Sequence, residues 1–288
     1  MTANDFDPQT IKALAFDLDG TLLSPGRTLG ERNLRSLQSC MEKGIQIILS
    51  TGRSLDSGEK FRRRIGAKGP HVYYNGAEVA DMSAGKMIYT RFIDPQPVLF
   101  CVELARRMGI YYQAYFPAGV INEPDEDSSG EVLMADKLTE ESEFYEKSTG
   151  VPVAAGDLEA YLAKTPAIIK GMFITAEETL EKIRPILEER FGSSVYLARS
   201  CPVYLETLAA GVSKGAGLLH ALDYLNLKPE HTIAFGDEEN DLPMFEAAGF
   251  SAAPANAKEA VRKAAVFQIP SHAEDGVAVF LEEQFRIR

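Results

Sequence analysis

The sequence predicts an α/β protein in which helices cover a parallel sheet and a second domain of α+β type is inserted. Two observations predict this class. Near both ends of the chain, short apolar segments alternate with amphipathic helical segments, as in parallel sheets covered by helices. Over residues 84–207, longer helical and strand-like segments are separated by polar loops. We therefore expect a core of residues 1–83 and 208–288, and an inserted domain of residues 84–207.

The first part of the chain reads as strand, helix, strand, helix and strand. Residues 11–16 form a mostly apolar run that ends abruptly at Asp17, as a buried strand opening into a loop does. Thr28 and Glu31 have the spacing of a capping box, which predicts a helix start, and Gly44 predicts its end. The other elements expected here are a strand at 46–49, a helix at 55–65 and a strand at 71–74.

The C-terminal part resumes the alternation. A helix is expected after Lys214, and an apolar strand at residues 232–235 then leads into Asp237. Helices are also expected near residues 242–248 and 277–285. In the inserted domain, the strand candidates are residues 86–90, 110–116, 168–174 and 195–197, and the acidic stretch 123–127 is expected to be a solvated loop.

Composition limits the classes of partner. The chain has 288 residues, of which 45% are hydrophobic, as in a globular protein with a sizeable core. A net charge of -12 argues against binding to nucleic acid or anionic membranes, and an anionic substrate would need a local positive cluster. Three cysteines without CxxC spacing predict neither a disulfide framework nor a zinc site. With no signal peptide or membrane-spanning run, we expect a cytoplasmic protein, and no obligate protein partner is evident.

Carboxylates gather at the predicted carboxyl ends of the strands, where open parallel sheets bind ligands. Asp17 and Asp19 are two residues apart on extended chain and would face one side, while Asp237 and Asp241 follow the late strand. Crowded carboxylates are costly unless a cation or a shared proton relieves them, and Mg²⁺ prefers oxygen ligands. The alternative is that the first loop is an ordinary turn and that residues 236–241 only cap the next helix. We favour metal binding because the charges directly follow apolar strands.

Two other positions offer groups that bind phosphate. Thr51 and Gly52 follow the second strand and provide a hydroxyl group and an unhindered backbone N–H. Lys214 provides a positive charge at a helix start. Each has a plain alternative: an ordinary strand-to-helix turn for the first pair, and a solvated lysine beside a Ser213 cap for the second. The occurrence of these segments together with the acidic loops favours a phosphate site.

In this order, four segments resemble the motifs of the haloacid dehalogenase superfamily, and in particular its Cof-type phosphatases with an α/β cap of the C2B type. The segments are residues 17–22, residues 51–53, Lys214 and residues 236–241. Residues 74–76 and 274–277 also lie where these phosphatases have similar strings. The resemblance covers essentially the whole chain. It implies a Rossmann-like three-layer core with a parallel sheet and an inserted α+β cap.

The resemblance also implies an activity, that of a Mg²⁺-dependent phosphatase that hydrolyses small phosphorylated metabolites, sugar phosphates foremost, through an aspartyl-phosphate. Asp17 would be the nucleophile, and Asp19 the general acid and base. The implied Mg²⁺ ligands are Asp17, Asp19, Asp237 and Asp241, with Asp19 binding through its backbone carbonyl. The groups implied to hold the phosphoryl oxygens are Leu18, Thr51, Gly52, Lys214 and Asn240. Two alternatives stay open, a phosphomutase of the same superfamily and a non-catalytic protein that binds a phosphorylated metabolite.

Overall fold

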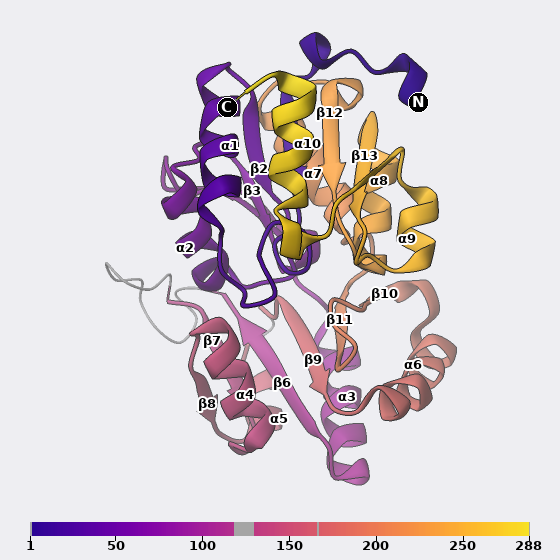
Figure 1. Cartoon of the computed structure of the whole chain (residues 1–288). Coiled ribbons are helices and arrows are strands. Elements are labelled where there is room, and N and C mark those ends of the chain that lie inside the picture. Colours follow the sequence, from indigo (N-terminus) through magenta and orange to yellow (C-terminus); the bar gives the residue numbers. More distant parts are fainter. Residues whose placement is uncertain (1, 118–129, 166, 288) are drawn as a thin grey trace. The chain divides into compact units, whose positions relative to one another are not determined.

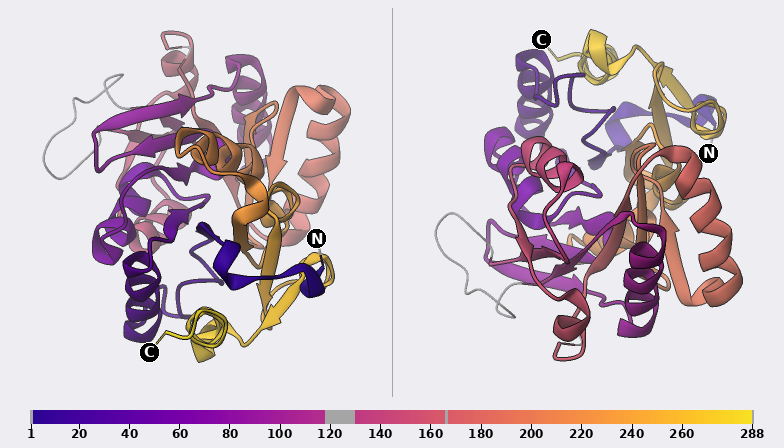
Figure 2. Two further views of the ribbon diagram at one scale, coloured as in Figure 1. Left: turned by 90° about the horizontal axis from the view of Figure 1, so that it is seen from above. Right: turned by 90° about the horizontal axis from the view of Figure 1, so that it is seen from below.

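The structure is a computed structural model that describes residues 2–117, 130–165 and 167–287 (Figure 1). The acidic stretch 123–127 lies outside the described residues. The chain divides into two compact units. The first comprises Met1–Gly52, Gly58–Tyr89 and Ser213–Arg288, and the second comprises Arg53–Ser57 and Thr90–Val212. Both termini therefore belong to the first unit, where Figure 2 marks them.

A five-stranded parallel sheet forms the centre of the first unit, in the order β14-β13-β12-β1-β2. The strands are β1 (Ala13–Phe16), β2 (Gln46–Leu49), β12 (Thr232–Phe235), β13 (Phe250–Pro254) and β14 (Phe267–Ile269). β1 pairs with β2 on one side and with β12 on the other, and all four of its residues are buried. Because β1 and β12 are parallel neighbours, the loops that begin at Asp17 and Gly236 leave the same edge of the sheet.

Two hydrophobic cores lie on opposite faces of this sheet. Leu14 and Phe16 of β1 belong to one core, and Ala13 and Ala15 to the other, because side chains alternate along a strand. α1 (Glu31–Glu42) and α10 (Gly276–Phe285) contribute to the first core. The second core is built with α7 (Lys214–Tyr224), α8 (Leu242–Ala247) and α9 (Glu259–Ala264). The predicted three-layer arrangement is confirmed.

The predicted capping box of the first helix is wrong, although its end is correct. The N-cap of α1 is Gly30, which makes no side-chain cap. Thr28 lies in the preceding loop, where its Oγ1 is 2.9 Å from Ser24 Oγ and its carbonyl accepts from the Ser24 N–H. The hydroxyl therefore stabilises the turn and cannot reach the helix start. Gly44 follows the helix with φ 81°, a left-handed conformation that agrees with its predicted role in ending the helix.

The first unit also contains a smaller, three-stranded sheet. It consists of β3 (His71–Tyr73), β4 (Glu78–Asp81) and β5 (Lys86–Thr90), and Ser50 bridges to Val72 of β3. In this sheet β3 and β4 are antiparallel. Residues 86–90 are predicted to belong to the inserted domain. In the structure this strand lies beside β4, so the unit ends at Tyr89 rather than at residue 83. α2 (Leu55–Ile65) occupies its predicted position.

The second unit contains a mostly antiparallel sheet in the order β10-β11-β9-β6-β7-β8. Its strands are β6 (Tyr111–Phe116), β7 (Val132–Ala135), β8 (Val153–Ala155), β9 (Lys170–Ile174), β10 (Val195–Ala198) and β11 (Tyr204–Ala209). Its helices are α3 (Pro95–Met108), α4 (Glu140–Thr149), α5 (Leu158–Leu162) and α6 (Glu177–Phe191). The predictions missed β7, β8 and β11. β11 is buried along its whole length yet contains Glu206 and Thr207, so its sequence does not read as an apolar run.

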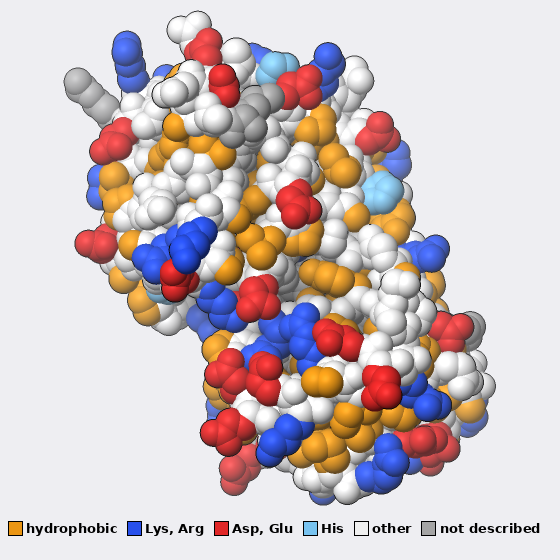
Figure 3. All heavy atoms as spheres, turned by 90° about the vertical axis from the view of Figure 1, so that its right-hand side faces the viewer, with side chains coloured by type: hydrophobic (Ala, Val, Ile, Leu, Met, Phe, Trp, Pro, Cys, Tyr) orange, Lys and Arg blue, Asp and Glu red, His pale blue; other side chains and the backbone are white. Residues whose placement is uncertain are grey.

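The surface of the described residues mixes both signs of charge. Acidic and basic side chains are interspersed on the face shown in Figure 3. Within the described part of the chain, every helix is too short or too polar to cross a membrane.

Candidate active site

Three buried carboxylates meet beyond the carboxyl ends of β1 and β12. Asp17 directly follows β1, and Asp237 and Asp241 lie in the loop after β12. One oxygen atom from each lies within 4.8 Å of the others. The Asp17 N–H donates to Phe235 O at 2.9 Å, so the pairing of the two strands fixes Asp17 beside the second loop. Asp17 lies 220 positions before Asp237 in the sequence, and the sheet topology brings the two together.

Lys214 supplies a buried positive charge at this cluster. Its Nζ donates to Asp17 Oδ1 at 2.5 Å and to Asp241 Oδ1 at 2.6 Å. Its side chain is 1% exposed, so the alternative of a solvated lysine is wrong. The neighbouring Ser213 caps α7, accepting from the Ala216 N–H at 3.1 Å. The cap fixes the start of the helix and with it the base of the lysine side chain.

Asp241 uses its two oxygen atoms differently. Oδ2 accepts from the backbone N–H groups of Asp237 at 2.9 Å and Glu238 at 3.0 Å, whereas Oδ1 accepts from Lys214. Asp241 therefore orders the turn that precedes α8, and the alternative that this loop caps α8 is wrong, because the helix has no side-chain cap. A Cβ atom at Gly236 would overlap the Asp241 side chain, so the loop requires glycine at that position.

Burial and repulsion raise the pKa values of two of these carboxyl groups. Loss of solvation is the largest cause of the raised pKa of Asp17, which Lys214 opposes and Asp241 increases. Burial likewise raises the pKa of Asp237, with Asp17 and Asp241 adding to it, while the Thr21 hydroxyl, which donates to Asp237 Oδ1 at 2.7 Å, lowers it. One lysine does not balance three buried carboxylates. The set therefore fits a divalent cation that prefers oxygen ligands, as Mg²⁺ does.

Asp19 has a different environment from Asp17. Its side chain is 37% exposed, and its Oδ1 lies 4.0 Å from Arg27 Nε. It is not a member of the three-carboxylate cluster found among the described residues. Gly20, the next residue, has φ 83°, and a Cβ there would overlap the Asp237 carboxylate. The apolar side chain of Leu18 is buried in the core, so a contact with a phosphoryl oxygen would have to come from its backbone N–H.

The other predicted phosphate-binding residues meet around Asn75. The Asn75 N–H donates to Thr51 O at 2.9 Å, and its Oδ1 accepts from Asn240 Nδ2 at 2.9 Å. A Cβ at Gly52 would lie 3.1 Å from the same Oδ1. In the sequence, residues 74–76 are indicated only as a string typical of the family, and no signal identifies Thr21 as a partner of Asp237. An Asn-Gly pair after a predicted strand is a turn signal and could have drawn attention to Asn75.

The family described as haloacid dehalogenase-like hydrolase matches residues 14–281. The 5-amino-6-(5-phospho-D-ribitylamino)uracil phosphatase of Bacillus subtilis (strain 168) is 30% identical over 279 residues, covering 95% of this chain and 97% of that protein. The pyridoxal phosphate phosphatase of Escherichia coli (strain K12) is 27% identical over 283 residues, covering 94% and 98%. A solved phosphatase of the haloalkanoate (HAD) superfamily from Bacteroides thetaiotaomicron is 27% identical, with a TM-score of 0.75 and 96% of each chain covered. The predicted resemblance and fold class are confirmed.

Proposed function

The chain belongs to the haloacid dehalogenase-like hydrolases and is a phosphomonoester hydrolase, and from this premise we propose a Mg²⁺-dependent enzyme that forms an aspartyl-phosphate at Asp17. One observation carries the proposal. Asp17, Asp237 and Asp241 form a buried cluster, and Lys214 contacts two of the three. A site of this kind offers a carboxylate nucleophile, ligands for a cation and a fixed positive charge.

Asp17 is the proposed nucleophile because its carboxylate is held in place from two sides. Its backbone continues the buried strand β1, and Lys214 donates to Oδ1. In the proposed step a carboxylate oxygen attacks phosphorus, the bond from phosphorus to the leaving oxygen breaks, and an acyl phosphate forms. Water then attacks phosphorus, releases phosphate and restores the carboxylate. The Lys214 charge lowers the pKa of Asp17 and so favours its reactive, ionised form.

The cation and the second aspartate have separate tasks. Asp17, Asp237 and Asp241 would hold Mg²⁺, together with the backbone carbonyl of Asp19. When bound, Mg²⁺ would neutralise charge on the phosphoryl oxygens, so that one anion can approach another. The Asp19 carboxyl would give its proton to the leaving oxygen and then take one from the attacking water. Its partial exposure lets it exchange protons with solvent, which the buried Asp17 does less readily.

The remaining site residues would bind the phosphoryl oxygens of the substrate. They are the Leu18 and Gly52 N–H groups, the Thr51 hydroxyl, the Lys214 ammonium and the Asn240 amide. All are donors, and four of them lie on three loops that converge at one end of the first unit. This local set would attract an anion even though the whole chain carries a net charge of -12.

The proposed substrates are small phosphomonoesters, with sugar phosphates first. Two relatives act on a phosphoribityl compound and on pyridoxal phosphate, which are both small phosphorylated metabolites. The second unit would then contribute to the choice of leaving group, as an inserted cap does in enzymes that close over small substrates.

The test measures phosphate release from a panel of sugar phosphates, nucleotides and cofactor phosphates, with and without Mg²⁺. We expect release that depends on Mg²⁺ and that falls by several orders of magnitude in Asp17→Asn. Asp223→Asn, at an exposed aspartate of α7, is the matched control and should stay active. Release from no member of the panel, or full activity of Asp17→Asn, would contradict the proposal.

Water labelled with ¹⁸O separates hydrolysis from phosphoryl transfer. A hydrolase places the label in the released phosphate, because water attacks the aspartyl-phosphate. If the phosphoryl group were instead transferred to a second substrate hydroxyl and carried no ¹⁸O, the phosphomutase alternative would be favoured.

A further inference from the structure

Three consecutive buried residues after β3 have left-handed backbone conformations. The φ angles are 50° at Tyr74, 56° at Asn75 and 100° at Gly76. Residues other than glycine rarely adopt such angles, and they persist only where the surrounding structure holds them. Strain of this kind gathers at functional sites, so the contacts of this segment indicate what it is for.

The segment is hydrogen-bonded to the loop after β2. Thr51 N–H donates to Val72 O at 2.9 Å, and Thr51 O accepts from the Asn75 N–H at 2.9 Å. Thr51 is therefore held on both sides of its backbone by β3 and the left-handed segment. The adjacent Gly52 packs so closely that a Cβ would lie 3.1 Å from Asn75 Oδ1.

The same segment reaches the loop after β12 through a side chain. Asn240 Nδ2 donates to Asn75 Oδ1 at 2.9 Å, and both residues are at most 3% exposed. This bond orients the Asn240 amide. Asparagine suits position 75 for two reasons. It tolerates the left-handed region, and its side chain provides the oxygen that accepts from Asn240.

A third contact leads to the start of α7. A Cβ at Gly76 would overlap the carbonyl of Ser213, the residue that precedes Lys214. One turn further along α7, a Cβ at Gly217 would lie 3.0 Å from Gly76 Cα. The segment therefore packs directly against the helix end that carries Lys214.

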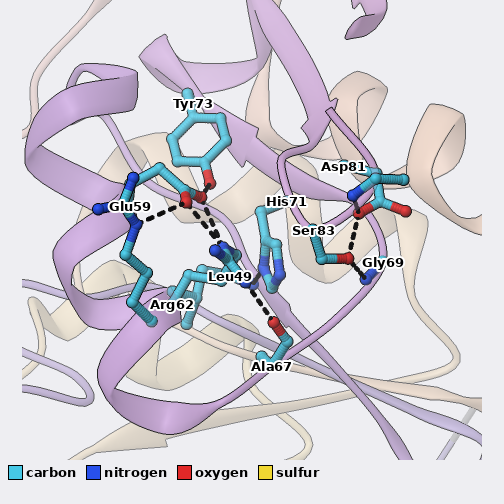
Figure 4. Close-up of polar contacts among 11 residues, drawn as sticks. Leu49, Glu59, Arg62, Ala67, Gly69, His71, Tyr73, Asp81 and Ser83 are labelled. Carbon is cyan, nitrogen blue, oxygen red and sulfur yellow. Dashed lines mark hydrogen bonds and ion pairs between the residues drawn. The ribbon is translucent and has the colours of Figure 1, made fainter. Parts of the chain in front are cut away.

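The left-handed segment is itself anchored through β3. His71 Nδ1 accepts from the Leu49 N–H at 3.0 Å, and the Tyr73 hydroxyl donates to Glu59 of α2 at 2.5 Å (Figure 4). Arg62 also donates to Glu59, at 2.8 Å. These contacts tie β3 to β2 and α2, and so they supply the rigid surroundings that strained residues need.

We propose that residues 74–76 are the positioning segment of the phosphoryl site, in which Asn75 sets the Thr51–Gly52 loop and Asn240 at a fixed spacing. The inference rests on the proposed function, since the two loops and the helix start that the segment contacts carry groups assigned to the phosphoryl oxygens. Asn75 is a positioning residue and acts through Thr51, Gly52 and Asn240. Displacing a positioned group by about 1 Å can cost up to about a hundredfold in rate.

The test uses Asn75→Gly, which keeps the left-handed backbone and removes the amide. Asn226→Gly is the matched control, because Asn226 also has a positive φ, 53°, but lies at the far end of α7 from Lys214. Asn240→Ala and the double variant complete a cycle. The measurements are kcat and KM for a phosphomonoester that the enzyme hydrolyses, the inhibition constant of inorganic phosphate, and the melting temperature.

We expect Asn75→Gly to weaken inhibition by phosphate between about tenfold and a hundredfold. The double variant should be less impaired than the two single effects combined would predict, because both changes remove the contribution of Asn240. Asn226→Gly should leave the phosphate constant unchanged. An unchanged phosphate constant in Asn75→Gly would overturn the inference whatever happens to the melting temperature, and so would additive effects in the cycle.

The experiments distinguish a failure of the proposed phosphatase function from a failure of the positioning role of Asn75. If Asp17→Asn retained full turnover, the nucleophile would be wrong, but the phosphate constants of the Asn75 cycle would still be measured. If the wild-type enzyme hydrolysed no substrate, calorimetric titration of the intact protein with inorganic phosphate would replace inhibition for the same four variants. Binding that is equal in wild type and Asn75→Gly would then overturn the positioning role.

Discussion

Lys214 Nζ donates to Asp17 Oδ1 across 2.5 Å, and neither side chain is more than 8% exposed. The ammonium group lowers the pKa of Asp17 against the opposing effects of burial and of Asp241. Lys214→Met keeps the length of the side chain and removes its charge, so the pKa of Asp17 should rise further. We expect kcat to fall about a hundredfold to a thousandfold, as when a donor to a developing charge is removed. The residual activity should require higher pH.

Steady-state kinetics from pH 5 to pH 9 check this prediction. Lys228→Met is the control, because Lys228 is 75% exposed and should tolerate the change. A Lys214→Met enzyme with nearly wild-type kcat and the same pH profile would show that the lysine does not act on Asp17 during turnover.

The raised pKa of Asp237 predicts how stability without metal depends on pH. Its carboxyl group titrates near 3.8 when unfolded and at about 9 when folded, with burial as the main cause. Between these values the folded state binds a proton that the unfolded state lacks, so stability falls as pH rises. We expect the melting temperature of the metal-free protein to decline from pH 7 to pH 9.

Mg²⁺ should reverse this decline. The ion competes with the proton for the carboxylates, so it should raise the melting temperature more at pH 9 than at pH 7. Asp237→Asn conserves the shape of the side chain and should flatten the decline in the metal-free protein. A wild-type melting temperature that is constant over this range, or equal stabilisation of Asp237→Asn by Mg²⁺, would count against the assignment.

The titration of His71 should make the protein more stable as pH rises, which is the opposite of the effect predicted for Asp237. Burial lowers its pKa to about 3, with Arg62 contributing, while Nδ1 accepts from the Leu49 N–H. The folded state therefore binds fewer protons than the unfolded state between about pH 3 and pH 6.5. The contribution of neutral His71 is complete above that window and is lost as pH falls through it.

We expect His71→Leu to lower the free energy of unfolding at pH 7 by about 1–3 kcal/mol, because the Leu49 N–H loses its acceptor. The difference from wild type should narrow at pH 5, where the wild type has lost part of the histidine contribution. Urea unfolding of the wild type and of His71→Leu at both pH values measures this difference in the free energy of unfolding. His220→Gln is the control; it changes an exposed histidine of α7 whose ring stacks on Tyr89, and it should cost less stability than His71→Leu at pH 7. An equal loss at pH 5 and pH 7 would contradict the titration argument.

The central strands and the site loops could be predicted because parallel strands buried on both faces are continuous apolar runs. β2 and β12 lie at their predicted positions, and β1 ends where the sequence predicts, one residue before Asp17. The contact between Asp17 and Lys214 could not be predicted from apolar runs. It joins residues 197 positions apart and depends on how α7 packs. The sequence predicts Lys214 at a phosphate site, but the direct contact of Lys214 with Asp17 becomes evident only from that packing.

Other errors come from polar residues that tertiary structure places against local rules. β11 contains Glu206 inside a fully buried strand, which an apolar pattern does not reveal. Thr28 has the spacing of a capping residue, but the turn at Arg27, where φ is 54°, keeps it in the loop. Asn75 is buried in a strained conformation, and its role depends on Thr51 and Asn240, which lie far away in the sequence.

The ion pair between Lys170 and Glu206 should control the stability of the second unit. Lys170 Nζ donates to Glu206 Oε2 at 2.6 Å, and the side chains are 2% and 1% exposed. Ser200 donates to the other carboxylate oxygen, and Nζ lies 4.6 Å from the centroid of the Tyr115 ring. Lys170→Met removes a positive charge from beside a buried carboxylate, and we expect a loss of about 3–5 kcal/mol in the free energy of unfolding.

The double variant Lys170→Met/Glu206→Leu distinguishes a coupled pair from two independent residues. Replacing both partners also removes the charge of the buried carboxylate, so most of the stability lost in Lys170→Met should return. Arg184→Met, which breaks an ion pair with the 54% exposed Glu188, is the control and should cost less than about 1 kcal/mol. Urea unfolding of the wild type, Lys170→Met, Glu206→Leu, the double variant and Arg184→Met measures these differences. If the double variant were as unstable as the sum of the two single changes, the cost would come from lost packing, and the buried charge would not explain it.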